Sequence, residues 1–345
     1  MKLLRFLLFP FAILYDVITR VRNWFFNIGI LKSTSFDIPV IAVGNLSVGG
    51  TGKSPQIEYL IRLLKDDYNI AVLSRGYKRK TEGFQLVNDT HTAEDVGDEP
   101  LQFYKKFKTA ITVAVDADRT NGIQQLLKRK NPPEVVLLDD AYQHRKVTAS
   151  SYILLTKYSD LFVDDFLLPT GNLRESRRGA KRAKVIVVTK CPESLSKAAQ
   201  EKIVRKLNPK PYQKVFFTTI AYDENLKGAE DLTIDDLKDK EVLLVTGIAN
   251  PTPLLSFLKE KKISFKYLNF PDHHNFTQQD IENIKKSYEA LASQQKIILT
   301  TEKDYMRLEG KVDSLNYISI KSDFISEEGI FNSLVLEEIR RVKTK

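Results

Sequence analysis

The segment that most constrains the fold is residues 43–55, which read VGNLSVGGTGKSP. An apolar run at 38–43 leads into it, and a helical pattern of apolar residues follows at 57–64. A strand, a glycine-rich turn ending in Gly-Lys-Ser and a helix form the layout of a phosphate-binding P-loop. The segment therefore predicts an α/β domain organised around this loop.

The chemistry of the loop follows from its residue types. Gly49, Gly50 and Gly52 allow the backbone to turn so that several N–H groups point at one phosphate chain. Lys53 can reach the β- and γ-phosphates, and the hydroxyl of Ser54 can ligate Mg²⁺. The helix that starts here adds the favourable dipole potential of its N-terminus.

One position departs from the usual G-x-x-x-x-G-K-[ST] pattern, because Ser47 stands where the first glycine is expected. Gly44, or the pair Gly49 and Gly50, could supply the turn instead. The alternative is a glycine-rich turn that binds nothing. The Gly-Lys-Ser sequence, with its flanking strand and helix, favours the phosphate-binding interpretation.

Size and charge limit the class of protein. A chain of 345 residues predicts two domains of ordinary size. The net charge of +9 favours an anionic partner, which could be a nucleotide, a nucleic acid or an acidic membrane surface. Cys191 is the only cysteine, so no intrachain disulfide can form, and we expect this residue to be structural.

Residues 1–31 are rich in large apolar side chains and have three interpretations: a signal peptide, a membrane span or a surface helix. Their longest uninterrupted apolar run is 6–15, which is shorter than the roughly 20 residues of a span. A signal peptide should end in a small-residue cleavage site, and the sequence shows none. We therefore expect a surface helix.

Placed at 100° per residue, this segment predicts an amphipathic helix with an aromatic anchor at Trp24. Its polar side is formed by Arg5, Asp16, Thr19, Arg20, Asn23 and Asn27. The helix could lie in a membrane interface or grip a lipid, or it could pack on the protein's own core. The wide apolar face favours the membrane interface.

Candidate site residues follow the expected strands, where the ligand crevice of an open α/β sheet is built. Arg75 comes shortly after a strand at 70–73. Four apolar residues at 135–138 precede Asp139 and Asp140. This is the Walker-B arrangement, in which a buried strand delivers a carboxylate to Mg²⁺.

Other polar groups stay ambiguous. The carboxylates in DVGDEP, residues 95–100, could ligate a metal, act as a base or only favour the N-terminus of the next helix. His144 could be a ligand or a proton carrier, although a structural histidine is the commoner case. Arg174 is a candidate phosphate clamp.

Polar sequence at 223–240 predicts a domain boundary. A new series of strands and helices starts at 242–246, so we expect a second α/β domain with parallel strands. The sequence DHH at 272–274 follows a predicted strand, and an Asp–His neighbour pair can tune a proton acceptor. A metal site there is less favoured, because no third ligand is apparent nearby.

The motifs occur in an order that resembles a known family over nearly the whole chain. They are GNLSVGGTGKSP, SRGY, VGDEP, DDAYQHR, LLPTGNLRE, TGIANP, PDHH and LTTEKD. This ordered set is similar to that of the tetraacyldisaccharide 4'-kinases, the lipid A 4'-kinases of Gram-negative bacteria. Two departures are Lys78, where the family often has glycine after SRGY, and Ala-Tyr at 141–142, where it often has Gly-Phe.

The resemblance implies a fold and a reaction. The fold would be two P-loop or Rossmann-like α/β domains with mainly parallel sheets, joined by a short β-type linker, plus the N-terminal helix. The enzyme would use ATP and Mg²⁺ to phosphorylate the 4'-hydroxyl of a tetraacyldisaccharide 1-phosphate, giving lipid IVA. The expected ranges are 1–32 for the membrane-interface helix, 33–222 for the kinase domain, 223–240 for the linker and 241–345 for the smaller domain.

The resemblance also implies roles for residues. Asp98 matches the family's proposed general base, His273 matches its partner, and domain closure would bring the two together; Lys53 is the third catalytic group. The expected ATP contacts are Asn45, Ser47, Gly49, Gly50, Thr51, Gly52, Lys53 and Ser54. The expected substrate contacts are Arg75, Tyr77, Asn172, Arg174 and Glu175. Ser54, Asp139 and Asp140 would hold the metal.

The same resemblance implies a monomer bound peripherally to the cytoplasmic side of the inner membrane, with a lipid substrate and no nucleic acid. Two other classes compete. A nucleotide-dependent switch or nucleic-acid-associated NTPase would fit the P-loop and the charge, but the sequence carries no guanine-reading N-K-x-D motif and no helicase motifs. A membrane-surface scaffold would leave the P-loop and Walker-B sequences unexplained.

Overall fold

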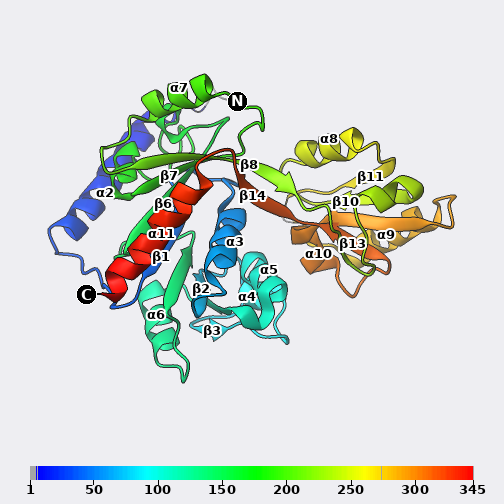
Figure 1. Ribbon diagram of the computed structural model, residues 1–345, viewed down its shortest axis with the longest axis horizontal. Coiled ribbons are helices and arrows are strands. Elements are labelled where there is room, and N and C mark those ends of the chain that lie inside the picture. The colour runs from blue at the N-terminus through cyan, green and yellow to red at the C-terminus, as the bar shows by residue number, and fades with distance from the viewer. Residues whose placement is uncertain (1–4, 6, 273, 345) are drawn as a thin grey trace. The chain divides into compact units, whose positions relative to one another are not determined.

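The computed structural model describes residues 5, 7–272 and 274–344 (Figure 1). The chain divides into two compact units, of which the first combines Met1–Ile220 with Ser322–Lys345. The second unit is Ala221–Lys321. Both units are α/β structures with mainly parallel sheets, which confirms the predicted fold class.

Within the described residues, the sheet of the first unit has the order β14-β8-β7-β6-β1-β5-β2-β4-β3. Its strands are β1 (Val40–Asn45), β2 (Ile70–Ser74), β3 (Gln85–Leu86), β4 (Thr112–Val115), β5 (Val135–Asp139), β6 (Ser151–Lys157), β7 (Val185–Thr189), β8 (Lys214–Tyr222) and β14 (Ile320–Phe324). Neighbours from β8 to β4 pair in parallel, whereas β3 is antiparallel to β4. The P-loop strand β1 therefore lies between β6 and β5.

Helices cover both faces of this sheet, because successive residues of the buried strands point to opposite sides. Ile41 and Val43 of β1 belong to one core, whereas Val40 and Ala42 belong to another. The α-helices of the unit are α2 (Phe9–Asn27), α3 (Lys53–Leu64), α4 (Ala93–Val96), α5 (Asp98–Phe107), α6 (Arg119–Leu127), α7 (Lys197–Leu207) and α11 (Glu328–Lys343). Helices α3, α5 and α11 contribute to the first core, and α6 contributes to the second (Figure 1).

Short 3₁₀ turns complete the connections. Those of the first unit are η1 (Lys108–Ala110), η2 (Phe162–Asp164) and η3 (Arg177–Arg182), and the second unit has η4 (Asp235–Asp239). A third core of the first unit joins α7 and η3 to β6, β7 and β8. The part of the sheet formed by β6, β7 and β8 is therefore covered, as is the part around the P-loop strand β1.

Helix α2 has its polar side against the first unit. Asn23 Nδ2 donates to Glu175 Oε1 at 2.9 Å. Arg145 donates to the carbonyl of Asn23 at 2.9 Å and to Oδ1 of Asn27 at 2.8 Å. The helix is thus attached through the side that the sequence predicts to be polar.

Most of the apolar side of α2 is exposed, whereas Ala12 is buried and Phe25 and Phe26 are half-buried. Phe11 is 62% exposed, Leu14 58%, Ile18 57% and Trp24 54%. This distribution does not match a helix packed on the protein's own core, which was the alternative left open by the sequence. Among the described residues, no helix is long and apolar enough to cross a membrane.

The second unit has a smaller sheet of order β11-β10-β12-β13-β9 in the described residues. Its strands are β9 (Lys227–Gly228), β10 (Glu241–Thr246), β11 (Phe265–Asn269), β12 (Lys296–Thr301) and β13 (Leu315–Ile318), and only β9 is antiparallel to its neighbour. Its α-helices are α8 (Thr252–Glu260), α9 (Gln278–Glu289) and α10 (Glu302–Leu308). Helix α8 covers one face, and α9 and α10 cover the other.

The C-terminal boundary differs from the expected smaller domain at 241–345. Residues 322–345 return to the first unit. Strand β14 lies beside β8, and Phe331, Val335 and Ile339 of α11 are buried in the first unit's core. The physical reason is the apolar side of α11, which completes the cover of the larger sheet.

The expected linker at 223–240 is also part of a folded unit. Leu226, Ile234 and Leu237 are buried in the core of the second unit together with β10 and α8. The polar composition of this segment comes from its exposed residues, whereas three apolar side chains anchor it. The chain therefore passes between the units at 220–221 and again at 321–322.

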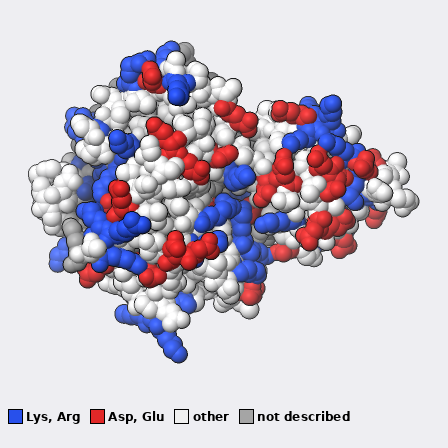
Figure 2. All heavy atoms as spheres, viewed as in Figure 1, with Lys and Arg blue, Asp and Glu red and all other residues white. Residues whose placement is uncertain are grey.

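Basic and acidic side chains are interspersed on the face seen in Figure 2. Several form ion pairs, such as Lys106 with Glu58 at 2.7 Å and Lys206 with Asp164 at 2.6 Å. On this face, acidic groups interrupt the basic ones over both units. The net positive charge is therefore not gathered there into one basic surface.

Candidate active site

The P-loop sequence forms the turn that its glycines predict. Strand β1 ends at Asn45, and α3 starts at Lys53. Gly49 and Gly52 have φ angles of +104° and +84°, a region that glycine adopts without a steric penalty. Gly52 is also the N-cap of α3, so the loop leads directly to the positive end of a helix dipole.

The departure at Ser47 has a structural explanation. Ser47 forms an isolated antiparallel bridge with Leu173, so this end of the loop is extended and needs no glycine. Gly44 lies within β1 and does not supply the turn, contrary to one suggestion from the sequence. A Cβ at Gly44 would lie 2.7 Å from Cβ of Tyr142, so glycine is required there for close packing.

The segment LLPTGNLRE is hydrogen-bonded to the beginning of the P-loop. The carbonyl of Asn172 accepts a hydrogen bond from the N–H of Val48 at 2.7 Å, and the N–H of Arg174 donates to the carbonyl of Leu46 at 2.7 Å. The Asn172 side chain accepts from Arg5 at 3.1 Å. Asn172 and Arg174 are therefore brought to the phosphate loop, as the sequence predicts.

A second contact holds the loop from the β7 side. Oγ1 of Thr189, the last residue of β7, donates to the carbonyl of Thr51 at 2.7 Å. Asn45 Nδ2 donates to the carbonyl of Gly49 at 3.4 Å. Thr189 was not recognised from the sequence, because nothing local indicates that β7 ends beside the P-loop.

Asp139 lies at the end of β5, in register with Val43 of the P-loop strand. Its Oδ2 accepts a hydrogen bond from Oγ of Ser74 at 3.0 Å. Burial raises the pKa of Asp139, and the negative charges of Glu99 and Asp140 raise it further. The site therefore concentrates negative charge, which a bound cation would stabilise.

Asp140 is the meeting point of two cations. Its Oδ2 lies 3.5 Å from Nζ of Lys53 and 3.2 Å from Nη1 of Arg174. Burial by itself would raise the pKa of Asp140, but the charges of Lys53 and Arg174 outweigh it and the pKa is lowered. The structure thus joins three predicted residues from three separate segments.

The acidic motif VGDEP is placed beside the P-loop by α5. Asp98 and Glu99 form the first turn of this helix, where negative charge is favourable. Oγ of Ser54 lies 3.1 Å from Oε1 of Glu99. Glu99 was not assigned a role from the sequence, although the adjacent carboxylate in the motif was a signal. Asp98 is partly buried in the same turn.

The loop after β2 approaches α5 through two glycines. A Cβ at Gly97 would lie 3.3 Å from Cα of Gly76, and both residues have positive φ. Tyr77 is 67% exposed, and Arg75 is also exposed. Lys78 has a φ of +59°, a region that glycine adopts more readily than lysine.

Glu175 is more enclosed than a substrate contact needs to be. The residue is only 4% exposed. It pairs with Arg182 through both carboxylate oxygens, at 2.5 Å and 2.8 Å, and also accepts from Asn23 of α2. The hydroxyl of Tyr15, also on α2, donates to the carbonyl of Arg174 at 2.8 Å. This region therefore connects α2 to the P-loop.

The predicted partner of Asp98, His273, lies outside the described residues. The neighbouring His274 has a structural environment: its Nε2 lies 2.9 Å from Oδ2 of Asp280, and its ring stacks on Phe270 at 5.1 Å. Hydrogen bonds from Thr277, followed by that from His274, lower the pKa of Asp280 to about 2. Asp280 is the capping-box residue of α9, so it fixes His274 in place.

Two other groups singled out from the sequence are enclosed. Burial raises the pKa of Cys191 to about 12, and its Sγ donates to the carbonyl of Val188. Burial and then the charge of Arg119 lower the pKa of His144 to about 4. A neutral thiol and a neutral imidazole at pH 7 are consistent with structural residues.

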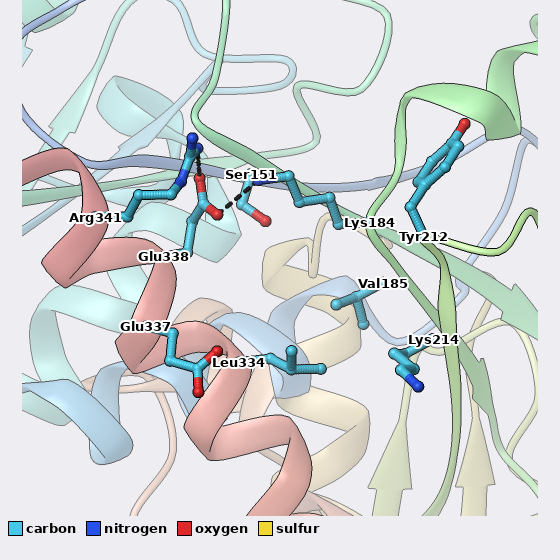
Figure 3. Close-up of a pocket in the computed structure, with 9 residues that line it drawn as sticks. All are labelled: Ser151, Lys184, Val185, Tyr212, Lys214, Leu334, Glu337, Glu338 and Arg341. Atoms are coloured by element: carbon cyan, nitrogen blue, oxygen red, sulfur yellow. Dashed lines mark hydrogen bonds and ion pairs between the residues drawn. The ribbon is translucent and has the colours of Figure 1, made fainter.

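A cavity of about 170 Å³ lies elsewhere, at the starts of β6, β7 and β8 (Figure 3). Ser151, Lys184 and Glu338 line it together with Arg341 of α11. Glu338 accepts from Lys184 at 2.6 Å and also pairs with Arg341. Three of the cavity's charged groups are therefore already paired with one another. The cavity lies at the opposite ends of the strands from the P-loop.

The residues around the P-loop have the chemistry of a magnesium site. In the described part of the chain, Oδ1 of Asp139 and Oδ1 of Asp140 are buried without hydrogen-bond partners. Carboxylate and hydroxyl oxygens are the ligands that Mg²⁺ prefers, and it usually keeps several waters. A cluster of three His, Cys, Asp or Glu ligands does not occur in the described residues, but a site of Ser54 and two carboxylates does not require one.

The fold and this site define a P-loop protein with a Walker-B carboxylate pair. The profile of the tetraacyldisaccharide-1-P 4'-kinase family matches residues 4–340. The chain belongs to this family and is a kinase of lipid A biosynthesis.

Curated relatives and a solved structure agree with this assignment. The tetraacyldisaccharide 4'-kinase of Flavobacterium johnsoniae is 56% identical over 343 residues, covering 99% of this chain and 98% of the relative. That of Bacteroides thetaiotaomicron is 47% identical over 313 residues, covering 87% and 82%. The crystal structure of LpxK from Aquifex aeolicus in complex with ATP is 32% identical, with a TM-score of 0.79 and coverage of 97% and 99%.

Proposed function

We propose that the chain transfers the γ-phosphoryl group of ATP to the 4'-hydroxyl of tetraacyldisaccharide 1-phosphate, giving lipid IVA. The observation that carries the proposal is the convergence of Lys53 and Arg174 on Asp140 at the P-loop. These groups come from the Walker-A, LLPTGNLRE and Walker-B segments, and a phosphoryl-transfer site needs such charged groups at one place.

The nucleotide would be held by the P-loop. Backbone N–H groups at Gly49, Gly50 and Gly52 and the N-terminus of α3 suit the phosphate chain. Lys53 suits the β- and γ-phosphates. The remaining expected ATP contacts are Asn45, Ser47, Thr51 and Ser54.

Magnesium would be held by Ser54, Asp139 and Asp140. Held there, the cation would supply positive charge to neutralise the phosphates. Glu99 is a further candidate, because its carboxylate lies 3.1 Å from the Ser54 hydroxyl. The unpartnered oxygens of Asp139 and Asp140 support this assignment over a purely structural role.

The chemical step needs a proton acceptor. In the proposed step the 4'-oxygen bonds to the γ-phosphorus, and the bond from that phosphorus to the β–γ bridging oxygen breaks. The hydroxyl proton goes to the carboxylate of Asp98, and the electron pair leaves with ADP. Asp98 lies in the first turn of α5 beside Glu99, and His273 is proposed as the group that raises its competence as a base.

The sugar substrate would be bound by residues that surround the same loop. Arg75 and Tyr77 are exposed after β2 and can reach a ligand. Arg174 is placed to stabilise charge on the transferred group, since it already contacts Asp140. Asn172 and Glu175 are proposed to act mainly by positioning, because both are bonded to other parts of the protein.

The N-terminal helix is proposed to hold the enzyme at the cytoplasmic face of the inner membrane as a monomer. Its apolar side chains are exposed while its polar side contacts the first unit. An interfacial helix needs this distribution, with the apolar side toward acyl chains. Its attachment near Arg174 would bring the phosphate loop close to the lipid surface.

The test of the proposed function is phosphoryl transfer from [γ-³²P]ATP to detergent-dispersed tetraacyldisaccharide 1-phosphate. Asp98→Ala should lower kcat by about 10²–10⁴-fold, the range of a positioned general base. The matched control is Glu94→Gln on helix α4, which removes an exposed carboxylate that pairs with Lys80. This variant should retain activity. If folded wild-type protein left the lipid unlabelled, the proposed substrate would be wrong. If Asp98→Ala stayed active, the general base would be a residue other than Asp98.

A further inference from the structure

Two lysine ammonium groups lie against the P-loop and belong to neither the Walker-A nor the Walker-B segment. A Cβ added at Gly49 would lie 3.7 Å from Nζ of Lys157, and one added at Gly50 would lie 4.0 Å from Nζ of Lys190. Lys157 is the last residue of β6, and Lys190 directly follows β7. Neither residue was expected from the sequence to bind a ligand.

These lysines lie on the opposite side of β1 from the carboxylates. The local sheet order is β7-β6-β1-β5-β2. Asp139 is on β5, and its partner Ser74 is on β2. If the γ-phosphate reacts on the carboxylate side, the phosphate chain has to extend toward β6 and β7. The two ammonium groups are therefore placed for the phosphates nearer the nucleoside.

The charges of this pair are not balanced within the protein. In the part of the chain that the structure describes, no acidic side chain forms an ion pair with either lysine. Lys190 is exposed, yet desolvation of its ammonium group lowers its pKa and the charge of Lys157 lowers it further. Two neighbouring like charges are destabilising unless an anion binds between or beside them.

The backbone holds the pair in place. Lys157 and Thr189 are register partners, and the N–H of Tyr158 donates to the carbonyl of Thr189 at 2.9 Å. Thr189 in turn holds the carbonyl of Thr51 in the P-loop. Lys190 has a φ of +58°, a left-handed conformation that is unfavourable for a lysine. Such strain persists where the surrounding structure fixes it, often at a binding site.

We infer that Lys157 and Lys190 form a second cation pair that binds the α- and β-phosphates of the nucleotide. This inference rests on the proposed use of ATP. On the β5 side of the P-loop, Lys53, Arg174 and the carboxylates would act on the transferred phosphate. On the β6 and β7 side, the two lysines would hold the phosphates that stay on ADP. The 1-phosphate of the lipid is the other source of the same chemistry, and the test separates the two.

The first measurement is ADP affinity by calorimetry with the full-length protein in detergent and without lipid. Lys157→Met and Lys190→Met should each weaken ADP binding about tenfold or more, the loss expected for one charge-assisted hydrogen bond. In turnover assays the KM for ATP should rise similarly, with kcat and the KM for lipid little changed. The control is Lys202→Met on the exposed side of α7, which should change none of these values.

A second measurement separates binding from folding. Without nucleotide, Lys190→Met should unfold at the same or a higher temperature than wild type, because a like-charge contact is removed. With saturating ADP its thermal shift should be smaller than that of wild type. Unchanged ADP affinity in both variants would overturn the inference, as would a raised KM for lipid alone, which would assign the pair to the lipid phosphate. Wild type that binds no nucleotide would contradict the proposed function instead.

Discussion

Adjacent residues in this site have opposite electrostatic environments. Asp139 is buried beside other carboxylates, which raises its pKa, whereas Lys53 and Arg174 lower the pKa of Asp140. A sequence of two aspartates cannot distinguish these cases, because the partners come from distant segments. For single residues, the structure therefore reveals the charge partners and the close packing that the motifs alone do not predict.

His144 gives a prediction about pH. Burial, with the charge of Arg119, lowers its pKa to about 4, compared with about 6.5 in an unfolded chain. The unfolded state therefore binds the proton first, and this residue's contribution to stability is lost as pH falls from about 6.5 to about 4. His144→Gln should lose less melting temperature than wild type between pH 7 and pH 5.

The environment of His144 also includes Asp118, Lys146 and Arg22, so melting curves should be recorded at constant ionic strength. The control is His91→Gln, which removes a histidine from the turn after β3. It should follow the wild-type pH dependence. Equal losses in His144→Gln and wild type would contradict this account.

Gly44 and Gly329 form a matched pair for testing close packing. A Cβ at Gly44 would lie 2.7 Å from that of Tyr142, so Gly44→Ala should lower the unfolding free energy by about 1–3 kcal/mol. A Cβ at Gly329 in α11 meets nothing within 4 Å, so Gly329→Ala should be neutral or stabilising by about 0.5–1 kcal/mol. Urea unfolding checks both signs, and a stabilising Gly44→Ala would contradict the packing argument.

At the scale of elements, α2 shows how a helix can be attached by its polar side. Tyr15 and Asn23 contact the loop that carries Arg174 and Glu175, while large apolar side chains remain exposed. The sequence predicted both faces of this helix. It could not predict which protein segment the polar face contacts, because that depends on where LLPTGNLRE lies in the fold.

The exposed side of α2 is predicted to drive membrane binding. Ile18→Asp should reduce co-sedimentation with anionic phospholipid vesicles several-fold, because it places a charge where acyl chains would lie. The protein should keep its melting temperature, since Ile18 is 57% exposed. Ile330→Asp, at a 51% exposed position on α11, is the control and should bind vesicles like wild type. Equal binding by both variants would exclude α2 as the membrane contact.

The alternation of strands and helices was predictable from apolar runs and glycine-rich turns, and so were Lys53 and the Walker-B pair. Thr189, Lys157 and Lys190 were not, because their proximity to the P-loop results from the order of β7, β6 and β1. Glu99 is part of the recognised motif VGDEP, but its contact with Ser54 depends on how α5 is placed beside the P-loop. Local sequence specifies elements, and tertiary neighbours specify the rest of the site.

At the scale of the whole molecule, the first unit is assembled from both ends of the chain. The hydroxyl oxygen of Tyr59 on α3 lies 2.8 Å from Oε1 of Glu328 and 2.7 Å from the side-chain amide of Asn332, both on α11. Phe331 of the same helix is fully buried. The helix that carries the P-loop lysine is therefore supported by the last helix of the chain.

Phe331→Ala tests this assembly. It should lower the stability of the first unit by about 3–5 kcal/mol, as for other buried phenylalanines. Trp24, the only tryptophan, lies on α2 in the same unit. Its fluorescence during urea unfolding should therefore report the lower stability of the first unit. Leu258→Ala in the second unit's core should shift the Trp24 transition less. A larger shift from Leu258→Ala would contradict the assignment of α11 to the first unit.

The position of the new phosphate on the lipid product tests the proposed reaction most directly. Wild-type enzyme should convert ATP and tetraacyldisaccharide 1-phosphate into a bisphosphate whose second phosphorus couples to H4' in ³¹P–¹H NMR. Lys53→Met should form this product much more slowly, because the P-loop lysine would no longer neutralise the transferred phosphate. A phosphate at another hydroxyl, or release of inorganic phosphate alone, would contradict the account.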